Sequence, residues 1–231
     1  MTAQDTPAGP DQAGPNSGPA DSRPPGRAGA VLLWGLIAVC SVIELALLAA
    51  DHGLIGPARL RRLAYDYGGF WPGLLADWRP NYTGQPWAMF VTYGFLHGGF
   101  AHLLVNMITL WSLGRVVLAR VGAWGFGALY LATILGGAVG FALLAPGLRP
   151  MVGASGALFG LIGGVLAWTY IDRFTHAAGL WPVARAVLLL IALNLVLWWA
   201  MDGQLAWETH LGGFVTGWIA ALLIDPRPRR I

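Results

Sequence analysis

The sequence predicts an all-α polytopic membrane protein with six transmembrane helices. Of its 231 residues, 56% are hydrophobic and only 11% are charged, and the mean hydropathy is +0.60. Soluble domains carry about one quarter charged residues, so an ordinary soluble globule is excluded. Apolar runs that approach the roughly 20 residues of a membrane-crossing helix fill most of the chain, which also excludes a disordered or fibrous protein.

The apolar runs divide the chain into three parts. Residues 1–28 are rich in Pro, Gly, Ala, Ser and Asp and lack the hydrophobic segment of a signal peptide, so we expect a disordered tail. Residues 29–225 hold the six-helix core, and residues 226–231 form a short basic tail. The six spans are expected at residues 30–50, 100–119, 123–144, 155–170, 182–200 and 207–224.

The segment between the first two spans, residues 51–86, mixes Arg, Asp, Trp, Tyr, Gly and Pro. It is too long for a tight turn, and its aromatic and charged residues suit an amphipathic loop that lies in the membrane interface.

The basic residues set the expected orientation. All 14 are Arg, and an N-terminus inside the cell places nine of them on the inner side and five on the outer side. The positive-inside rule therefore favours cytoplasmic termini. Abundant Ala, Gly and Arg without Lys suggest a prokaryotic chain of high G+C coding bias, and hence the bacterial inner membrane.

Several partners and chemistries are disfavoured. The Arg residues are scattered, so nucleic acid is not an expected partner. A single cysteine, Cys40, excludes a disulfide framework and a Cys-rich metal site. Neither His97 nor His102 is followed by Glu, as a zinc protease helix requires, and no pair of aspartates lies inside the spans.

Polar side chains within the spans are the functional candidates, because each is costly in a bilayer. Even-numbered spans run in the same direction, so their N-terminal ends share the outer face of the membrane. One Ser, two His and one Asn can therefore meet at one depth. The candidates are Glu44, His97, His102, Asn106, Ser155 and His210.

Ser155 opens the fourth span between Ala154 and Gly156, where a helix N-terminus offers unpaired N–H groups to a developing oxyanion. Gly213 and Gly217 share a face with His210, and the fourth span has glycines at the same spacing, so the two helices can pack closely. That packing would bring an imidazole within reach of the Ser155 hydroxyl, as a general base requires.

Alternative roles remain open for these residues. Ser155 could instead cap its helix within a small-residue packing motif, and His210 could bond between helices. His102 and Asn106 share a helix face and can both donate hydrogen bonds, either to an oxyanion or to another helix. For His97 we expect a structural role. Glu44 has no assigned catalytic role. Glu208 lies two residues from His210 and points to another side of the helix, so a dyad without an acid is the simplest arrangement.

These residues resemble the rhomboid family of intramembrane serine proteases. The similarity lies in His97-x4-His102-x3-Asn106, Gly153-x-Ser155-Gly156 and His210-x2-Gly213-x3-Gly217, in the second, fourth and sixth spans. It covers about residues 30–224 and implies a rhomboid-like bundle with a long interfacial first loop. Substrates would be transmembrane proteins, cut near the outer end of their helices in a cavity open to the outside. The resemblance also implies that the reaction uses no metal and no cofactor.

The resemblance also implies individual roles. Ser155 would be the nucleophile and His210 the base, and the Ser155 N–H, His102 and Asn106 would form an oxyanion hole shaped by Gly153. Two positions depart from the family pattern: Ala88 stands where Arg is frequent, and Phe159 stands where Tyr is frequent. Phe159 can still pack on the His210 ring, so we expect altered substrate choice rather than inactivity.

Two other functions remain as alternatives. A catalytically silent rhomboid-like protein would bind membrane helices without cutting them, although such proteins usually lack the Ser or the His. An unrelated transporter or channel would use the polar residues to line a permeation path, and its flux would survive Ser155→Ala.

Overall fold

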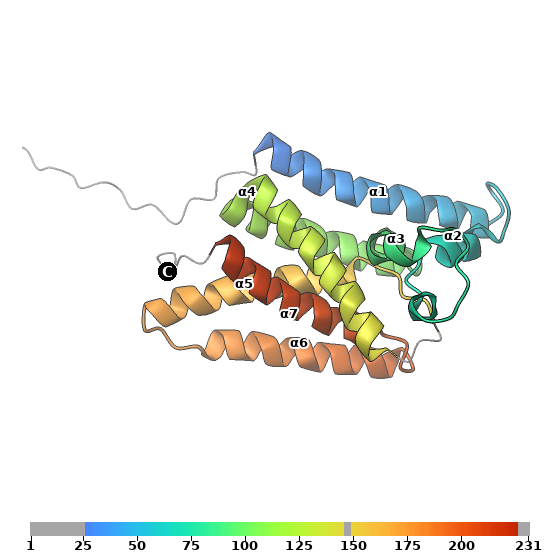
Figure 1. The fold of residues 1–231 in the computed structure, drawn as a ribbon. Coiled ribbons are helices and arrows are strands. Elements are labelled where there is room, and N and C mark those ends of the chain that lie inside the picture. The colour runs from blue at the N-terminus through green and yellow to red at the C-terminus, as the bar shows by residue number, and fades with distance from the viewer. Residues whose placement is uncertain (1–25, 146–148, 226–231) are drawn as a thin grey trace, which may run out of the picture.

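The computed structural model describes residues 26–145 and 149–225, which are almost entirely helical (Figure 1). One long helix is broken at Gly122, whose φ of 69° and ψ of −173° lie outside the helical region. With that break, the described residues form six long helical segments at the positions expected for the spans. The long helices are α1 (Arg27–Asp51), α4 (Phe100–Leu144), α5 (Ser155–Thr175), α6 (Trp181–Ala200) and α7 (Trp207–Ile224).

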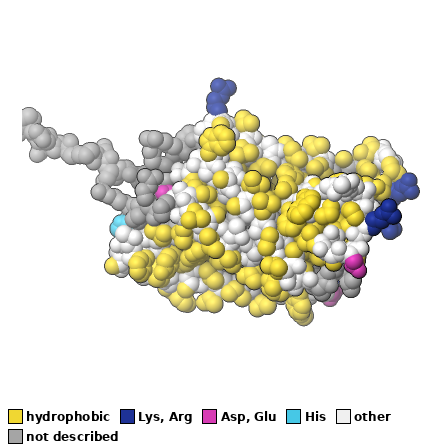
Figure 2. Space-filling model, in the orientation of Figure 1, with side chains coloured by type: hydrophobic (Ala, Val, Ile, Leu, Met, Phe, Trp, Pro, Cys, Tyr) yellow, Lys and Arg dark blue, Asp and Glu magenta, His cyan; other side chains and the backbone are white. Residues whose placement is uncertain are grey.

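The helices have the length and surface of an integral membrane protein. Within the described residues α1, α4, α5 and α6 are long and apolar enough to cross a membrane, and α4 has 45 residues. Helix α7 is not among them, because Glu208, Thr209 and His210 lower the hydropathy of its first turn. Hydrophobic side chains cover the middle of the face shown in Figure 2, and the charged ones lie toward its ends.

Helix α7 forms the centre of the bundle, packed against α4 and α5, while α1 and α6 lie at opposite edges (Figure 1). The contact between α5 and α7 is made by backbone. A Cβ atom at Gly213 would collide with the carbonyl oxygen of Gly156, and one at Gly217 with that of Gly160. Small residues that let two helices approach this closely are typical of membrane proteins.

The first loop is more structured than the sequence indicated. It folds into α2 (Leu60–Gly68), η1 (Pro72–Leu75), α3 (Gln85–Thr92) and η2 (Tyr93–Phe95), and so extends beyond the expected end at residue 86. These helices are too short for hydrophobic periodicity to reveal them. Phe70 and Met151 form an antiparallel bridge with two N–H···O bonds of 2.9 Å, which joins the loop to the segment before Ser155.

Arg61 anchors this loop to α1. Its guanidinium donates to both carboxylate oxygens of the fully buried Glu44, at 3.0 and 2.8 Å, and its Nε donates to Asp51 at 2.6 Å. Burial disfavours the charge, but the hydrogen bonds to Glu44, Tyr65 and Asp51 outweigh it and raise the pKa of Arg61. The loop is therefore held without an Arg at position 88.

The terminal tails lie mostly outside the described residues. This holds for residues 1–25 of the expected tail 1–28, and for the whole of the basic tail 226–231. Of the expected tail, Arg27 and Ala28 lie in the first turn of α1.

Candidate active site

Ser155 and His210 meet where the first turns of α5 and α7 lie against each other. Ser155 is the first residue of α5 and His210 the fourth of α7, and the Ser155 Oγ lies 2.9 Å from the His210 Nε2. His210 is 5% exposed and Ser155 is partly buried. The residue that caps α5 is Ala154, and the Ser155 hydroxyl that follows it lies at hydrogen-bond distance from the imidazole.

Phe159 lies one helical turn beyond Ser155 and stacks on the His210 ring. The ring centroids are 4.1 Å apart and the planes are inclined by 7°. Such stacking holds the imidazole plane in place through apolar contact. The hydroxyl of the Tyr that is frequent at this position is not needed for the contact.

His102 lies against the backbone that precedes Ser155. The Gly98 N–H donates to the His102 Nδ1 at 3.1 Å, so the neutral ring carries its proton on Nε2. Gly153 has a φ of +125°, which favours glycine, and a Cβ there would lie 2.7 Å from Cε1 and 2.9 Å from Nε2 of His102. The N–H donor of His102 is thus placed beside the Gly153–Ser155 backbone.

Asn106 lies one turn further along α4 and is 3% exposed. Its amide nitrogen donates to the His102 carbonyl at 2.8 Å, which leaves a second amide proton unused by this bond. Within the described residues Asn106 makes no hydrogen bond to Ser155, and its Oδ1 has no partner. The Asn106 amide therefore bonds within its own helix, to the backbone of His102.

His97 packs behind His102. It is fully buried, the two ring centroids are 5.3 Å apart, and the planes are inclined by 68°. Burial, reinforced by His102, lowers the pKa of His97 to about 4. The His97 carbonyl accepts hydrogen bonds from Arg61 and Tyr65 at 3.1 and 2.7 Å, which connects the first loop to this end of α4.

One contact at the site was missed by the sequence analysis. The His210 Nδ1 lies 2.7 Å from Oδ1 of Asn194 on α6. A signal was available, because Asn194 is an uncharged polar residue in an otherwise apolar stretch of the fifth span. The direction argument covered only even-numbered spans. The fifth span runs the opposite way, so residues near its C-terminal end reach the same depth.

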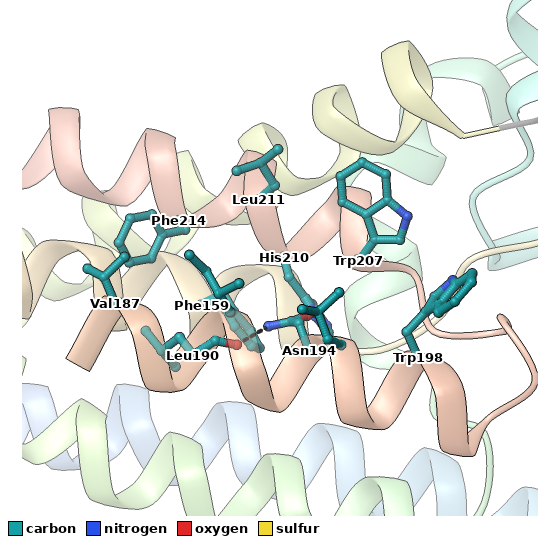
Figure 3. Close-up of a pocket in the computed structure, with 11 residues that line it drawn as sticks. Phe159, Val187, Leu190, Asn194, Trp198, Trp207, His210, Leu211 and Phe214 are labelled. Atoms are coloured by element: carbon teal, nitrogen blue, oxygen red, sulfur yellow. Dashed lines mark hydrogen bonds between the residues drawn. The ribbon is translucent and has the colours of Figure 1, made fainter. Parts of the chain in front are cut away.

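A cavity of about 550 Å³ opens between α6 and α7 beside His210 (Figure 3). Its walls are largely apolar, and it is lined by Phe159, Val187, Leu190, Ile191, Asn194, Leu195, Trp198, Trp207, His210, Leu211 and Phe214. Over residues 26–145 and 149–225, no three His, Cys, Asp or Glu side chains are grouped as metal ligands would be.

Residues 83–227 match the Rhomboid domain, which accounts for more than half of the chain. The chain belongs to the rhomboid family. The family's transmembrane character agrees with the apolar helical bundle, and we treat this rhomboid protein as an integral membrane protein with several spans.

Named relatives include both proteases and rhomboid-like proteins. The chain is 35% identical over 147 residues to RHOMBOID-like protein 5 of Arabidopsis thaliana, covering 63% of this chain and 46% of the relative. It is 32% identical over 135 residues to Rhomboid protease GluP of Bacillus subtilis, covering 58% and 25%. It is 31% identical over 156 residues to Rhomboid protein 1, mitochondrial, of Saccharomyces cerevisiae, covering 59% and 42%. The chain thus spans less than half the length of each of these relatives.

Proposed function

We propose that this rhomboid protein is an intramembrane serine endopeptidase that cleaves transmembrane proteins. The observation that carries the proposal is the 2.9 Å contact between the Ser155 Oγ and the His210 Nε2. A hydroxyl and an imidazole at hydrogen-bond distance form the minimal nucleophile and base pair. The protease named among the relatives supports the same activity.

In the proposed reaction Ser155 Oγ attacks the carbonyl carbon of the scissile peptide while its proton passes to the His210 Nε2. The negative charge that develops on the carbonyl oxygen is stabilised by three donors: the Ser155 N–H, the His102 N–H beside Gly153, and the second amide proton of Asn106. The C–N bond then breaks and the proton on Nε2 passes to the departing amine. Water then hydrolyses the resulting ester. His210 Nε2 takes a proton from the water as its oxygen attacks the ester carbonyl, and returns that proton to the Ser155 Oγ as the C–O bond breaks.

The helix directions suggest where the reaction occurs. Ser155 and His210 lie in the first turns of α5 and α7, at the same end of the bundle as the short helices of the first loop (Figure 1). We propose six spans, two of them within α4, cytoplasmic termini, and a site that opens to the outer face of a bacterial inner membrane. The substrate would be cut near the outer end of its helix.

The experiment is cleavage of a single-span substrate in proteoliposomes by the wild type, Ser155→Ala and His210→Ala. A second serine within a long helix, Ser41, offers a matched control as Ser41→Ala. We expect the wild type and the control to cut and both site variants to lose essentially all turnover, because members of a catalytic unit fail together. A fluorophosphonate probe should label the wild type at Ser155. Equal cleavage by all four proteins would contradict the proposal.

A catalytically silent rhomboid-like protein is the alternative, since some relatives are named only as rhomboid-like. In that case the wild type would show neither cleavage nor probe labelling, while photocrosslinking would still capture substrate helices. The contact between Ser155 and His210 favours the protease, because a protein that only binds helices has no need of that pair.

A further inference from the structure

Asn194 is an isolated polar side chain in the C-terminal half of α6, a lipid-facing helix. Every residue of α6 except Val183 is at least partly exposed, and the exposed side chains around Asn194 are Leu, Ile, Val and Trp. In the part of α6 that the structure describes, the contact with His210 is the only side-chain hydrogen bond that leaves the helix. A polar group in such a place is costly, so it calls for a functional explanation.

The orientation of the Asn194 amide is set by its other bond. Its Nδ2 donates to the Leu190 carbonyl at 3.0 Å, which turns Oδ1 toward the His210 ring (Figure 3). An amide oxygen only accepts hydrogen bonds, so the His210 Nδ1, 2.7 Å away, must carry the proton. In the neutral ring Nε2 then has a free lone pair, and that lone pair faces the Ser155 hydroxyl.

The tautomer with its proton on the His210 Nε2 would make an unfavourable contact at each ring nitrogen. Its Nδ1 lone pair would face the oxygen of Asn194, and its Nε2–H would point at the Ser155 oxygen and could not take up a proton. Largely apolar walls surround this side of the imidazole, so little else compensates for an unfavourable pairing. The tautomer that can act as a base is therefore selected by a neighbouring group, because a hydrogen bond at one ring nitrogen determines which nitrogen carries the proton.

We propose that Asn194 is a positioning residue that holds His210 in the tautomer able to deprotonate Ser155. The proposal rests on the proposed protease function. When the Ser155 proton moves to Nε2, the Nδ1–H stays on the ring and remains bonded to Asn194 Oδ1. The amide neither gains nor loses a proton, and its dipole faces the positive ring that forms.

The kinetic experiment compares Asn194→Leu, which removes the acceptor at similar volume, with Asn194→Asp, which retains one. We expect Asn194→Leu to lower kcat by about 10- to 100-fold with little change in KM, because the loss affects proton transfer and not substrate binding. Asn194→Asp should recover much of that loss. The control Leu193→Ala alters an exposed neighbour on α6 and should leave both constants unchanged.

A spectroscopic experiment tests the tautomer independently of activity. With ¹⁵N-labelled histidine, and His210 assigned by its absence in His210→Ala, the wild type should show a protonated Nδ1 and an unprotonated Nε2. Asn194→Leu should shift His210 toward the other tautomer. Should that variant not fold, Asn194→Ala also removes the acceptor, with a smaller side chain beside an existing cavity, and the same shift of the His210 tautomer is expected.

The proposal is overturned if the ¹⁵N pattern of His210 is the same with and without Asn194, or if Asn194→Leu keeps the wild-type kcat. Failure of the protease function would look different. The wild type would then not cleave, but the tautomer of His210 would still respond to Asn194.

Discussion

Gly153 shows how one residue without a side chain can determine the geometry of the site. Its φ of +125° and the His102 ring beside it leave no room for a Cβ. Any larger residue must displace either the ring or the backbone that leads into Ser155. Both belong to the proposed oxyanion hole, where a shift of a few tenths of an ångström weakens a hydrogen bond to the developing charge.

We predict that Gly153→Ala lowers kcat by about 100-fold, a loss comparable to removing one oxyanion-hole donor. The matched control is Gly179→Ala, since Gly179 has nothing within 4 Å of its ideal Cβ position and no positive φ. The measurement is cleavage of a single-span substrate by proteins with the same thermal midpoint. Wild-type activity of Gly153→Ala would show that the ring contact does not matter for the reaction.

At the level of residues, the sequence indicated the polar groups but not all their partners. The direction of the even-numbered spans brought Ser155 and His210 to the same depth, and the structure places them in contact. Asn194 was missed because its partner lies on a helix that runs the other way. The amide of Asn106 bonds to its own helix, a choice that residue spacing cannot reveal.

At the level of elements, the first loop is held to α1 by a buried ion pair. Glu44 is fully buried within α1, and the charge that compensates it comes from Arg61 on α2, whose side chain is 19% exposed. A buried carboxylate that loses its cation is strongly destabilising, whereas an exposed ion pair contributes little. Two adjacent residues of α2 provide the comparison: Arg61 pairs with a buried carboxylate, and Arg62 forms an exposed pair with Asp66.

We predict that Arg61→Gln lowers the free energy of unfolding by about 3 kcal/mol or more, because it leaves the Glu44 carboxylate unpaired. Arg62→Gln is the control, because the Arg62 side chain is 85% exposed, and its effect should stay within about 0.5 kcal/mol. The measurement is reversible unfolding in mixed micelles. Adding Glu44→Gln to Arg61→Gln should recover part of the loss, and the absence of any recovery would argue against the ion pair.

The segment that leads into α4 carries a pH-dependent contribution. The pKa of His97 is about 4 in the folded protein against 6.5 in an exposed chain, so between these values the unfolded state binds more protons. The contribution of the neutral His97 ring to the free energy of unfolding is fully present above about pH 6.5, and it is lost as the pH falls from there through about 4. The titratable group that packs on the ring is His102, and the His97 backbone carbonyl accepts hydrogen bonds from Arg61 and Tyr65.

We therefore predict that the free energy of unfolding falls as the pH is lowered from 6.5 to 4, with a slope from His97 of up to about 1.4 kcal/mol per pH unit. His97→Gln should flatten the slope. His52→Gln changes an exposed histidine at the end of α1 and should retain the wild-type slope. Equal slopes in all three proteins would mean that His97 is not held neutral by the fold.

The short helices of the loop also mark the limit of sequence reasoning at this scale. Composition alone predicts a span of about 20 apolar residues, and the long helices begin and end close to the expected residues. Helices α2 and α3 have nine and eight residues and form through contacts with α1, α4 and each other. Contacts of that kind cannot be read from a local pattern.

For the whole molecule, the arrangement of the helices places the site at one end of the bundle. The turn between α6 and α7 lies at the same end as Ser155, and the turn between α5 and α6 lies at the opposite end (Figure 1). If the site faces the outside, then residue 204 is outside and residue 178 is inside. The distribution of Arg residues favours this orientation, with nine of 14 on the inner side.

We predict that Gln204→Cys is labelled by a membrane-impermeant maleimide in intact cells, whereas Ala178→Cys is labelled only after the membrane is opened. Both variants are made with Cys40→Ser, which removes the chain's one cysteine, a residue that is buried. The two positions act as controls for each other, because each must react once the membrane is opened. The reverse pattern would place the Ser155 end on the cytoplasmic side. Substrates would then be cut at the inner ends of their helices, although the chemistry of Ser155 and His210 would be unchanged.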